Sequence, residues 1–171
     1  MDEETQGHLP AALESRASFL LSQLGLQSAQ SFAAGLTPLG LDPNRFGLLV
    51  HVARIEGQSQ QRLAEVLGIH QNTMVGIIDD LEARGLVQRR RHPNDRRAYA
   101  IHLTPAAREL LPAASRVADE QETRLLNKLS EAERAKLIEL LSLLAQRSGY
   151  RAGVHGGLGS PHSGSNTRED S

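Results

Sequence analysis

The sequence contains no cysteine, and this absence excludes several kinds of chemistry from its 171 residues. Without thiols there are no disulfide bonds, no thiolate metal ligands, no cysteine nucleophile and no thiol-based redox sensor. Long apolar runs are also missing, since none approaches the roughly 18 residues of a membrane-spanning helix. The chain opens on Asp2, Glu3 and Glu4, whereas a signal peptide opens on a basic segment. We therefore expect a cytoplasmic protein with no membrane partner.

The usual sequence signatures of an enzyme are missing as well. There is no glycine-rich phosphate loop, no nucleophile elbow, no pair of catalytic carboxylates and no His-Glu-x-x-His motif. The seven histidines are scattered, and no two of them have metal-ligand spacing with a carboxylate. We therefore predict no catalytic residue, no metal site and no cofactor. An enzyme is the less favoured alternative.

Composition predicts one globular domain followed by a disordered tail. Hydrophobic residues make up 39% of the chain and charged residues 23%, which is typical of a globular domain. From Gly149 onward glycine, serine and histidine become frequent and hydrophobic residues nearly disappear. The predicted domain is residues 9–148, and the predicted tail is residues 149–171.

The middle of the chain carries the signals of two short helices joined by a turn. Ser59 can cap a helix that Gly68 ends, and a four-residue turn at Ile69–Asn72 leads into a second helix that ends before Gly85. The predicted apolar side of this second helix consists of Thr73, Ile77, Ile78 and Leu81. This arrangement is the spacing of a helix-turn-helix.

A predicted β-hairpin follows the second helix. Leu86–Arg91 indicates one strand, and His92–Arg97 contains the proline, asparagine and aspartate that favour a turn. Beyond the turn, Tyr99, Ile101 and Leu103 alternate with Ala98, Ala100 and His102, a pattern that predicts a second strand. The pattern predicts a winged helix in a mainly α (α+β) fold, with residues 58–103 forming the DNA-binding lobe.

Leucine-rich helices are predicted on both sides of this lobe, over residues 9–35 and 104–148. Thr104–Pro105 can begin one of them, and Ser130 with Glu133 can form a capping box for another. Together these helices offer more apolar surface than a minimal DNA-reading module needs. A second copy of the chain is the simplest partner to cover it. The alternative is that the helices pack only against their own lobe.

Positive charge gathers at the predicted hairpin, although the whole chain has a net charge of −1. Six arginines lie between residues 84 and 97 against one acid, Asp95, whereas residues 1–56 hold three basic and six acidic side chains. Such a cluster beside a helix-turn-helix is typical of a surface that contacts DNA phosphates. The alternative is an arginine-bearing strand that keeps a sheet edge soluble.

These segments resemble the MarR-type winged helix-turn-helix regulators. The similar segments are Leu63–Ile69, Thr73, Leu81–Glu82, Arg84–Val87, Arg89, and the wing His92–Ala98 with Leu103–Thr104. The similarity extends over about residues 10–147, and the wing is its most specific part.

The resemblance implies a homodimer whose terminal helices interlock and place two winged helices on an inverted repeat in double-stranded DNA. It also implies a repressor that is released by a small-molecule effector, often aromatic or anionic. The effector is expected to bind between the dimer frame and the DNA-binding lobes, at residues that the sequence does not identify. The chain departs from the family at Val75 and Gly76, where threonine and a basic residue are frequent, and at Asp80, where a basic residue is frequent. A transcriptional activator of the same fold and a winged helix that binds only proteins are the alternatives.

The residues that the recognition helix is expected to present to DNA are Gln71, Asn72, Thr73, Val75 and Gly76. In the major groove Gln and Asn can bond adenine in two places, and a threonine methyl can touch thymine. Asn72 and Thr73 are equally suited to capping the helix, which needs the same short polar groups. The later part of the helix carries the acids Asp79, Asp80 and Glu82. We expect these acids to point away from phosphate or to pair with arginines.

The residues that the wing is expected to present are Arg91, Asn94, Asp95, Arg96 and Arg97. Arg96 is the tip residue expected in the minor groove, because narrow grooves attract arginine. Asp95 is expected to buttress Arg97. Arg89 and Arg90 are expected at phosphates, with one arginine of their strand pairing with Asp95. The alternative is a plain turn with solvated charges.

Overall fold

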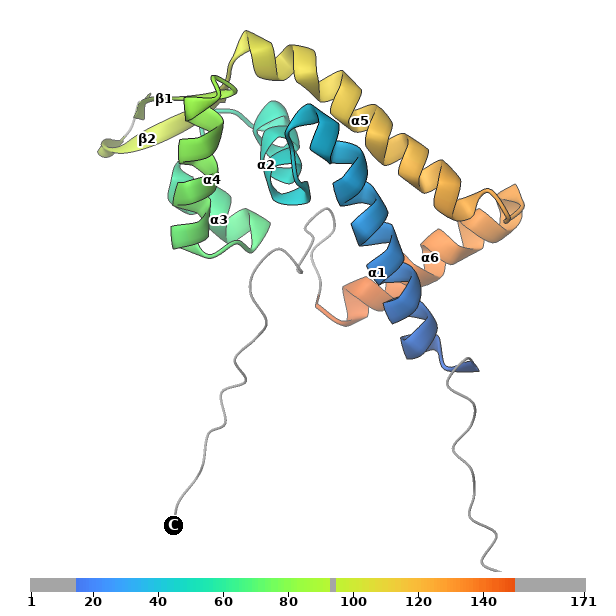
Figure 1. Cartoon of the computed structure of the whole chain (residues 1–171). Helices are drawn as coiled ribbons and strands as arrows, with labels where there is room; N and C mark the ends of the chain where they lie inside the picture. Colours follow the sequence, from blue (N-terminus) through green and yellow to red (C-terminus); the bar gives the residue numbers. More distant parts are fainter. Residues whose placement is uncertain (1–14, 93–94, 150–171) are drawn as a thin grey trace, which may run out of the picture.

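The computed structural model describes residues 15–92 and 95–149, and for residues 92 and 95–98 it describes the backbone alone. The elements are α1 (Ala17–Leu36), the 3-10 helix η2 (Thr37–Leu39), α2 (Pro43–Arg54), α3 (Gln60–Leu67), α4 (Gln71–Ala83), β1 (Val87–His92), β2 (Asp95–Leu103), α5 (Pro105–Leu126) and α6 (Glu131–Arg147). Figure 1 shows α2, α3, α4 and the β1–β2 hairpin gathered into one lobe, while α1, α5 and α6 form a frame beside it. The predicted fold class, a mainly α winged helix-turn-helix, is confirmed.

Short polar side chains begin four of these helices. The caps of α2, α3, α5 and α6 are Asp42, Ser59, Thr104 and Ser130, and each accepts the backbone N–H three positions on. A cap of this kind satisfies a backbone donor that has no partner within the helix. The Thr104 hydroxyl also donates to the Gly85 carbonyl at 2.6 Å, which ties the start of α5 to the end of α4.

The core of the lobe is built from the apolar faces of α2, α3 and α4, from the two strands and from the last residue of α1. Its largest fully buried side chains are Leu36, Leu48, Leu49, Val52, Leu63, Met74, Ile78, Leu81, Val87 and Ile101. Each aliphatic side chain of this size stabilises the fold by about 1.5–3 kcal/mol when it leaves water. Because α4 packs into this core by one face, its orientation in the lobe is fixed and its other face is free to bind.

The hairpin is antiparallel and is joined by a third short segment that the sequence did not reveal. Ser59 forms a bridge with Ala100, and the Ile101 backbone N–H donates to the Gln58 carbonyl at 2.9 Å. The Gly57 backbone N–H donates to the Ile101 carbonyl at 3.0 Å. The segment before α3 therefore holds the root of the hairpin against the lobe.

The alternation along β2 does not by itself decide which of its residues are buried. Tyr99 is 48% exposed, whereas Ala100 is 1% exposed and Ile101 is fully buried. Strict alternation fails because the segment around Ser59 covers Ala100, and because the outer part of the hairpin projects past the helices of the lobe (Figure 1).

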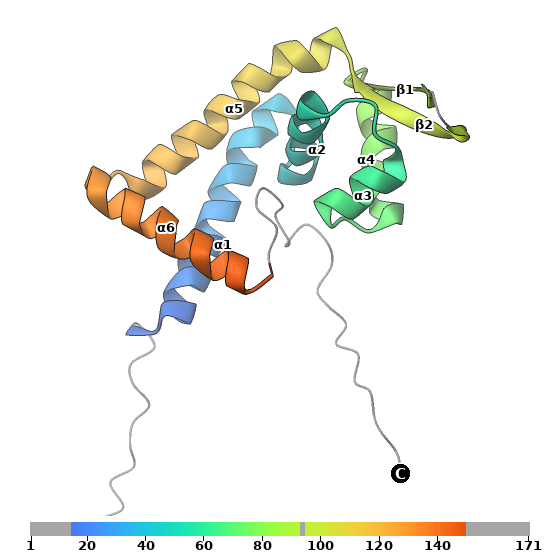
Figure 2. The same cartoon turned by 180° about the vertical axis from the view of Figure 1, so that it is seen from behind.

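The frame leaves many large apolar side chains uncovered. The exposed apolar side chains of α1 and α6 are Phe19, Leu20, Leu21, Leu24, Leu26, Ile138, Leu140, Leu141, Leu143 and Leu144. Figure 2 shows α6 crossing α1 at the end of the frame that lies farthest from the hairpin. None of the helices within residues 15–92 and 95–149 combines the length and apolar character needed to cross a bilayer. Residues 9–14 of the predicted frame and 150–171 of the predicted tail lie outside the described residues.

Candidate nucleic-acid interface

Helix α4 begins earlier than the sequence indicated. The His70 side chain is its cap, with Nδ1 accepting the Asn72 backbone N–H at 3.4 Å, and Gln71 is the first helical residue. The predicted turn at Ile69–Asn72 is therefore wrong, because its last two residues belong to the helix. Histidine is not among the usual caps, so propensity rules gave no signal for it. Since His70 has the capping role, the exposed side chains of Asn72 and Thr73 are left for other contacts.

The two faces of α4 differ in character. The buried face consists of Met74, Ile77, Ile78 and Leu81. Thr73 was predicted on this side and that prediction is wrong, since Thr73 is exposed and Met74 is fully buried. The exposed residues of the first two turns are Gln71, Asn72, Thr73, Val75 and Gly76, which are the five expected at DNA.

An arginine from β1 neutralises two acids of α4. The Arg89 guanidinium forms ion pairs with Asp79 and Glu82, and its backbone N–H donates to Glu82 Oε1 at 3.0 Å. Burial alone would lower the pKa of Arg89, but its bonds to the two carboxylates outweigh this and raise it. The expectation that the α4 acids pair with arginines is confirmed here. The expected phosphate role of Arg89 is not what the geometry favours, because its side chain is only 21% exposed and its charge is already paired.

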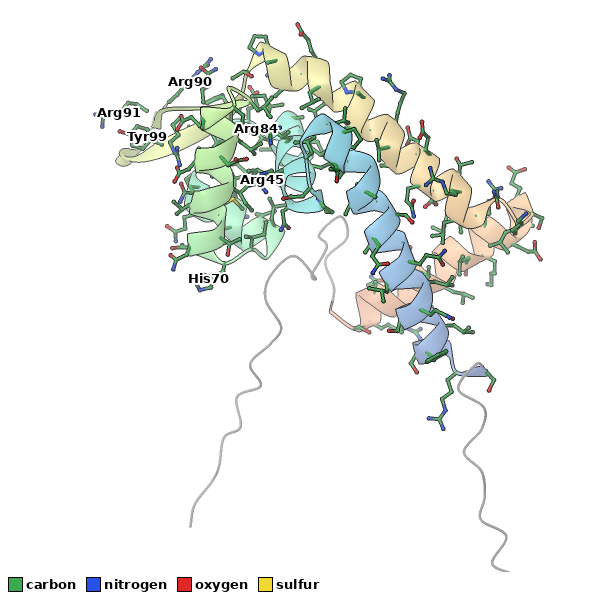
Figure 3. The ribbon with its side chains drawn as sticks, in the orientation of Figure 1. Arg45, His70, Arg84, Arg90, Arg91 and Tyr99 are labelled. Atoms are coloured by element: carbon green, nitrogen blue, oxygen red, sulfur yellow. The ribbon has the colours of Figure 1, made fainter. Side chains whose placement is uncertain are left out.

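A second network holds the third acid of α4. Arg45 Nε on α2 donates to Asp80 Oδ2 at 2.7 Å, and Arg84 Nη1 lies 3.6 Å from the same oxygen. Arg84 also donates to the Gly40 carbonyl at 2.6 Å, so the loop before α2 is joined to the end of α4. The hydrogen bond from Arg45 lowers the pKa of Asp80 below its ordinary value. Figure 3 shows both arginines on the side of α4 that faces α2, away from the hairpin tip.

The ion pairs of the α4 acids determine which charges α4 and the hairpin expose. Residues 71–97 contain six arginines and four acids, a net charge of 6 − 4 = +2 per chain. Three of the acids are held by Arg45, Arg84 and Arg89, and the exposed hairpin arginines whose side chains the structure describes are Arg90 and Arg91. A surface of this kind attracts a polyanion even though the whole chain is close to neutral.

The hairpin carries exposed cations on β1. Arg90 and Arg91 are both exposed, and Figure 3 shows them on the outer part of the hairpin. The Arg91 Cζ lies 5.7 Å from the centroid of the Tyr99 ring, its partner across the ladder. Tyr99 was missed as a functional residue, because only the strand register reveals that it supports Arg91.

The remaining wing residues cannot be placed by their side chains. Asp95, Arg96 and Arg97 belong to β2, and the structure describes their backbone alone. Asn94 lies outside the described residues. The minor-groove contact of Arg96 and the contact between Asp95 and Arg97 therefore stay predictions.

A junction between the lobe and the frame is centred on Glu56, which the sequence did not single out. This carboxylate forms an ion pair with Arg108 of α5, accepts the Leu103 backbone N–H at 3.2 Å, and lies 3.5 Å from His102 Nδ1. Burial would raise the pKa of Glu56, but the Leu103 N–H, Arg108 and His102 together lower it. The junction connects the end of β2 to the first turn of α5, and so couples the hairpin to the frame.

The frame also contains cavities. One of about 300 Å³ lies between α1 and α5, and its lining residues include Ser28, Phe32, Gln121, Glu122 and Leu125. Another, of about 380 Å³, lies where α1, α5 and α6 meet and is lined mainly by leucines. The first cavity thus mixes polar and apolar groups, whereas the second is mainly aliphatic.

Known proteins are similar to this chain in both architecture and sequence. Residues 39–98 match the model of the MarR family. A relative from Thauera aromatica, whose name assigns it to transcriptional regulation of the hcr operon, is 32% identical over 127 residues, or 74% of this chain and 76% of its own length. A protein from Pseudomonas aeruginosa described as a probable transcriptional regulator is 31% identical, with a TM-score of 0.68 over 77% of this chain and 98% of that one.

A third similar protein was solved with nucleic acid. The transcriptional repressor CouR, bound to a 23-mer DNA duplex, is 31% identical, with a TM-score of 0.71 over 78% of this chain and 94% of that one. Family match, curated relative and solved structures agree with one another and with the geometry of α4 and the hairpin. The chain belongs to the MarR family, whose members are DNA-binding transcriptional regulators and not enzymes.

Proposed function

We propose that the chain is a homodimeric repressor that binds an inverted repeat in double-stranded DNA and is released by a small-molecule effector. The observation that carries the proposal is the combination of an exposed, uncharged face on α4 with the exposed cations Arg90 and Arg91 on the adjoining hairpin. A helix of this width fits the major groove, and cations beside it can reach the flanking phosphates.

Contacts to DNA divide between the two elements. Gln71, Asn72, Thr73, Val75 and Gly76 meet base edges in the major groove, because they form the exposed start of α4. Arg90 contacts phosphate, and Arg91 does so with its guanidinium held against Tyr99. The wing tip, with Asn94, Asp95, Arg96 and Arg97, lies at the adjacent minor groove. Arg89 is left out of this set because Asp79 and Glu82 hold it.

A homodimer is supported by the apolar face of the frame. Monomeric proteins rarely expose large contiguous apolar patches, and α1 and α6 together expose ten large apolar side chains. A two-fold axis through the frame presents two copies of α4 and of the hairpin, so the DNA site becomes an inverted repeat.

The effector proposal is supported by the cavity between α1 and α5 and by a related structure. CouR from Rhodococcus jostii RHA1, 30% identical to this chain, was solved bound to p-coumaroyl-CoA. The cavity measures about 300 Å³ and has Ser28 and Gln121 as neutral polar groups and Glu122 as its one charged residue. We infer that it takes the neutral aromatic part of an acyl-CoA or phenolic ligand, with any anionic part lying outside.

The DNA-binding and dimer proposals are tested together by footprinting the region upstream of the protein's own gene and by sedimentation. The expected result is two protected stretches related by a two-fold axis and a particle of two chains. Ile138→Glu places a charge on the exposed apolar face of α6. It should give a monomer that protects no DNA, whereas Lys136→Glu, a matched change at a solvated position of the same helix, should stay dimeric. A monomeric wild-type protein that protects DNA would contradict the dimer.

The effector proposal is tested by adding p-coumaroyl-CoA or p-coumarate to the protein–DNA complex and measuring release by fluorescence anisotropy. Ala118→Leu narrows the cavity between α1 and α5, and should weaken the response to the ligand while leaving DNA affinity unchanged. A variant that responds as the wild type does would place the effector elsewhere.

A further inference from the structure

The exposed face of α4 carries no charge along its first two turns. From Gln71 to Ile78 there is no Lys, Arg, Asp or Glu, and Asp79 is the first charged residue of the helix. Val75 lies on this face with 37% of its surface exposed, one turn after Gln71 and Asn72. An exposed valine gains nothing from water, so its position among base-reading residues points to an apolar partner on the DNA.

Gly76 lies beside Val75 and has no structural reason to be glycine. A Cβ built at this position meets nothing within 4 Å, and its backbone is helical without a positive φ. Glycine in the interior of a helix is less stable than alanine. A missing side chain on an exposed helix face allows another surface to approach the backbone closely, and this surface is the one proposed to enter the groove.

The arginines nearest to α4 do not place a cation on its uncharged face. Guanine is usually read in the major groove by Arg or Lys bonded to its O6 and N7 atoms. Arg84 is bound to the Gly40 carbonyl, and Arg89 to Asp79 and Glu82. The groups left on the face are the amides of Gln71 and Asn72, which bond adenine, and the methyl groups of Thr73 and Val75, which match the 5-methyl group of thymine. Val75 is the only one of these four side chains that has no polar group, so thymine is its natural partner.

We propose that Val75 is a specificity-determining residue that packs on a thymine 5-methyl group, with Gly76 letting α4 sit close to the base edges. Each half-site is then read by α4 as A·T pairs, through Gln71 and Asn72 at adenine and Val75 at thymine. This inference rests on the proposed function, because it requires α4 in the major groove.

The test is a double-mutant cycle that removes the same methyl contact first from the DNA and then from the protein. Duplexes are selected from a pool with a randomised 20-base-pair centre, and each thymine of the selected sequence is then replaced by deoxyuracil, which lacks only the methyl group. At one thymine in each half-site the wild-type protein should lose about fourfold in affinity, the equivalent of about 0.8 kcal/mol for one buried carbon. Replacement in both half-sites should lower the affinity about 15-fold.

Val75→Ala should lose a similar factor on the thymine duplex and nothing further on the uracil duplex. The matched control is Ile55→Ala, which truncates an aliphatic side chain of 54% exposure outside α4 and should keep the full uracil effect. Failure of the wild type to select any sequence would remove the proposed function itself. Selection of a site followed by indifference to uracil at every thymine, or a Val75→Ala protein that keeps the uracil effect, would overturn the role of Val75 alone.

Discussion

Replacing Arg89 by methionine separates two roles that an arginine on this strand can have. The change keeps the aliphatic stem and removes the guanidinium, so Asp79 and Glu82 lose their partner. Both carboxylates are partly exposed, with side-chain exposures of 58% and 39%. Water therefore compensates for much of the loss, and we expect the free energy of unfolding to fall by about 1–2 kcal/mol rather than the larger value for a buried pair.

That loss corresponds to a melting temperature lower by about 2–8 °C for a domain of this size. Circular dichroism on heating measures it, and Asp79→Asn with Glu82→Gln in the Arg89→Met background should restore much of the stability. Arg90→Met is the matched control, since Arg90 is the next residue of β1 and is exposed. It should leave the melting temperature unchanged and reduce the slope of log affinity against log salt by about 1.8 for two phosphates per dimer.

The opposite pattern would refute this reasoning. If Arg89→Met melts as the wild type does and reduces the salt slope by the amount expected of Arg90→Met, then Arg89 contacts phosphate and its pairing with the acids of α4 contributes little in solution.

Three further predictions concern the junction, α4 and the network behind it. The lowered pKa of Glu56 means that its contacts stabilise the native state above the ordinary pKa of 4.5 and are lost as pH falls through the lower native value; Glu56→Gln should therefore flatten the dependence of melting temperature on pH below about 4.5. Gly76→Ala should raise the melting temperature by about 1–4 °C from helix propensity and should weaken DNA binding, so an unchanged affinity would contradict close approach at this position. Asp80→Asn should lower the melting temperature and flatten its dependence on pH below the ordinary carboxyl value of 3.8, because the pKa of Asp80 is lowered by Arg45; equal acid sensitivity of variant and wild type would count against the network.

Local signals predicted most of the fold. Ser59, Thr104 and Ser130 cap the helices that they were expected to cap, and Gly68 and Gly85 adopt the positive φ angles of helix ends. These features depend on a few neighbouring residues, so they can be read directly from the chain.

The errors arose where distant residues decide the structure. Met74 is buried and Thr73 is exposed because the direction of the lobe core, rather than the local pattern, sets which side of α4 is buried. Tyr99 faces solvent because the hairpin extends past the lobe, and its contact with Arg91 depends on the strand register.

The candidate site was predicted in its location and less well in its roles. The residues expected at DNA on α4 are exposed, but Thr73 was also expected on the apolar side of the helix. The partners of Arg89 lie seven and ten positions away on another element. The Glu56 junction joins residues 47 and 52 positions apart, and no local rule brings such groups together.

The central claim is that two copies of α4 and of the hairpin together hold one DNA duplex. It is tested most directly by titrating the selected inverted-repeat duplex, and the same duplex with one half-site scrambled, at salt concentrations between 50 and 200 mM. The account predicts two chains per intact duplex, affinity that falls steeply and linearly on a log–log plot against salt, and a large loss with the scrambled half-site. Binding of one chain per duplex, or affinity that is independent of salt and of the second half-site, would contradict it.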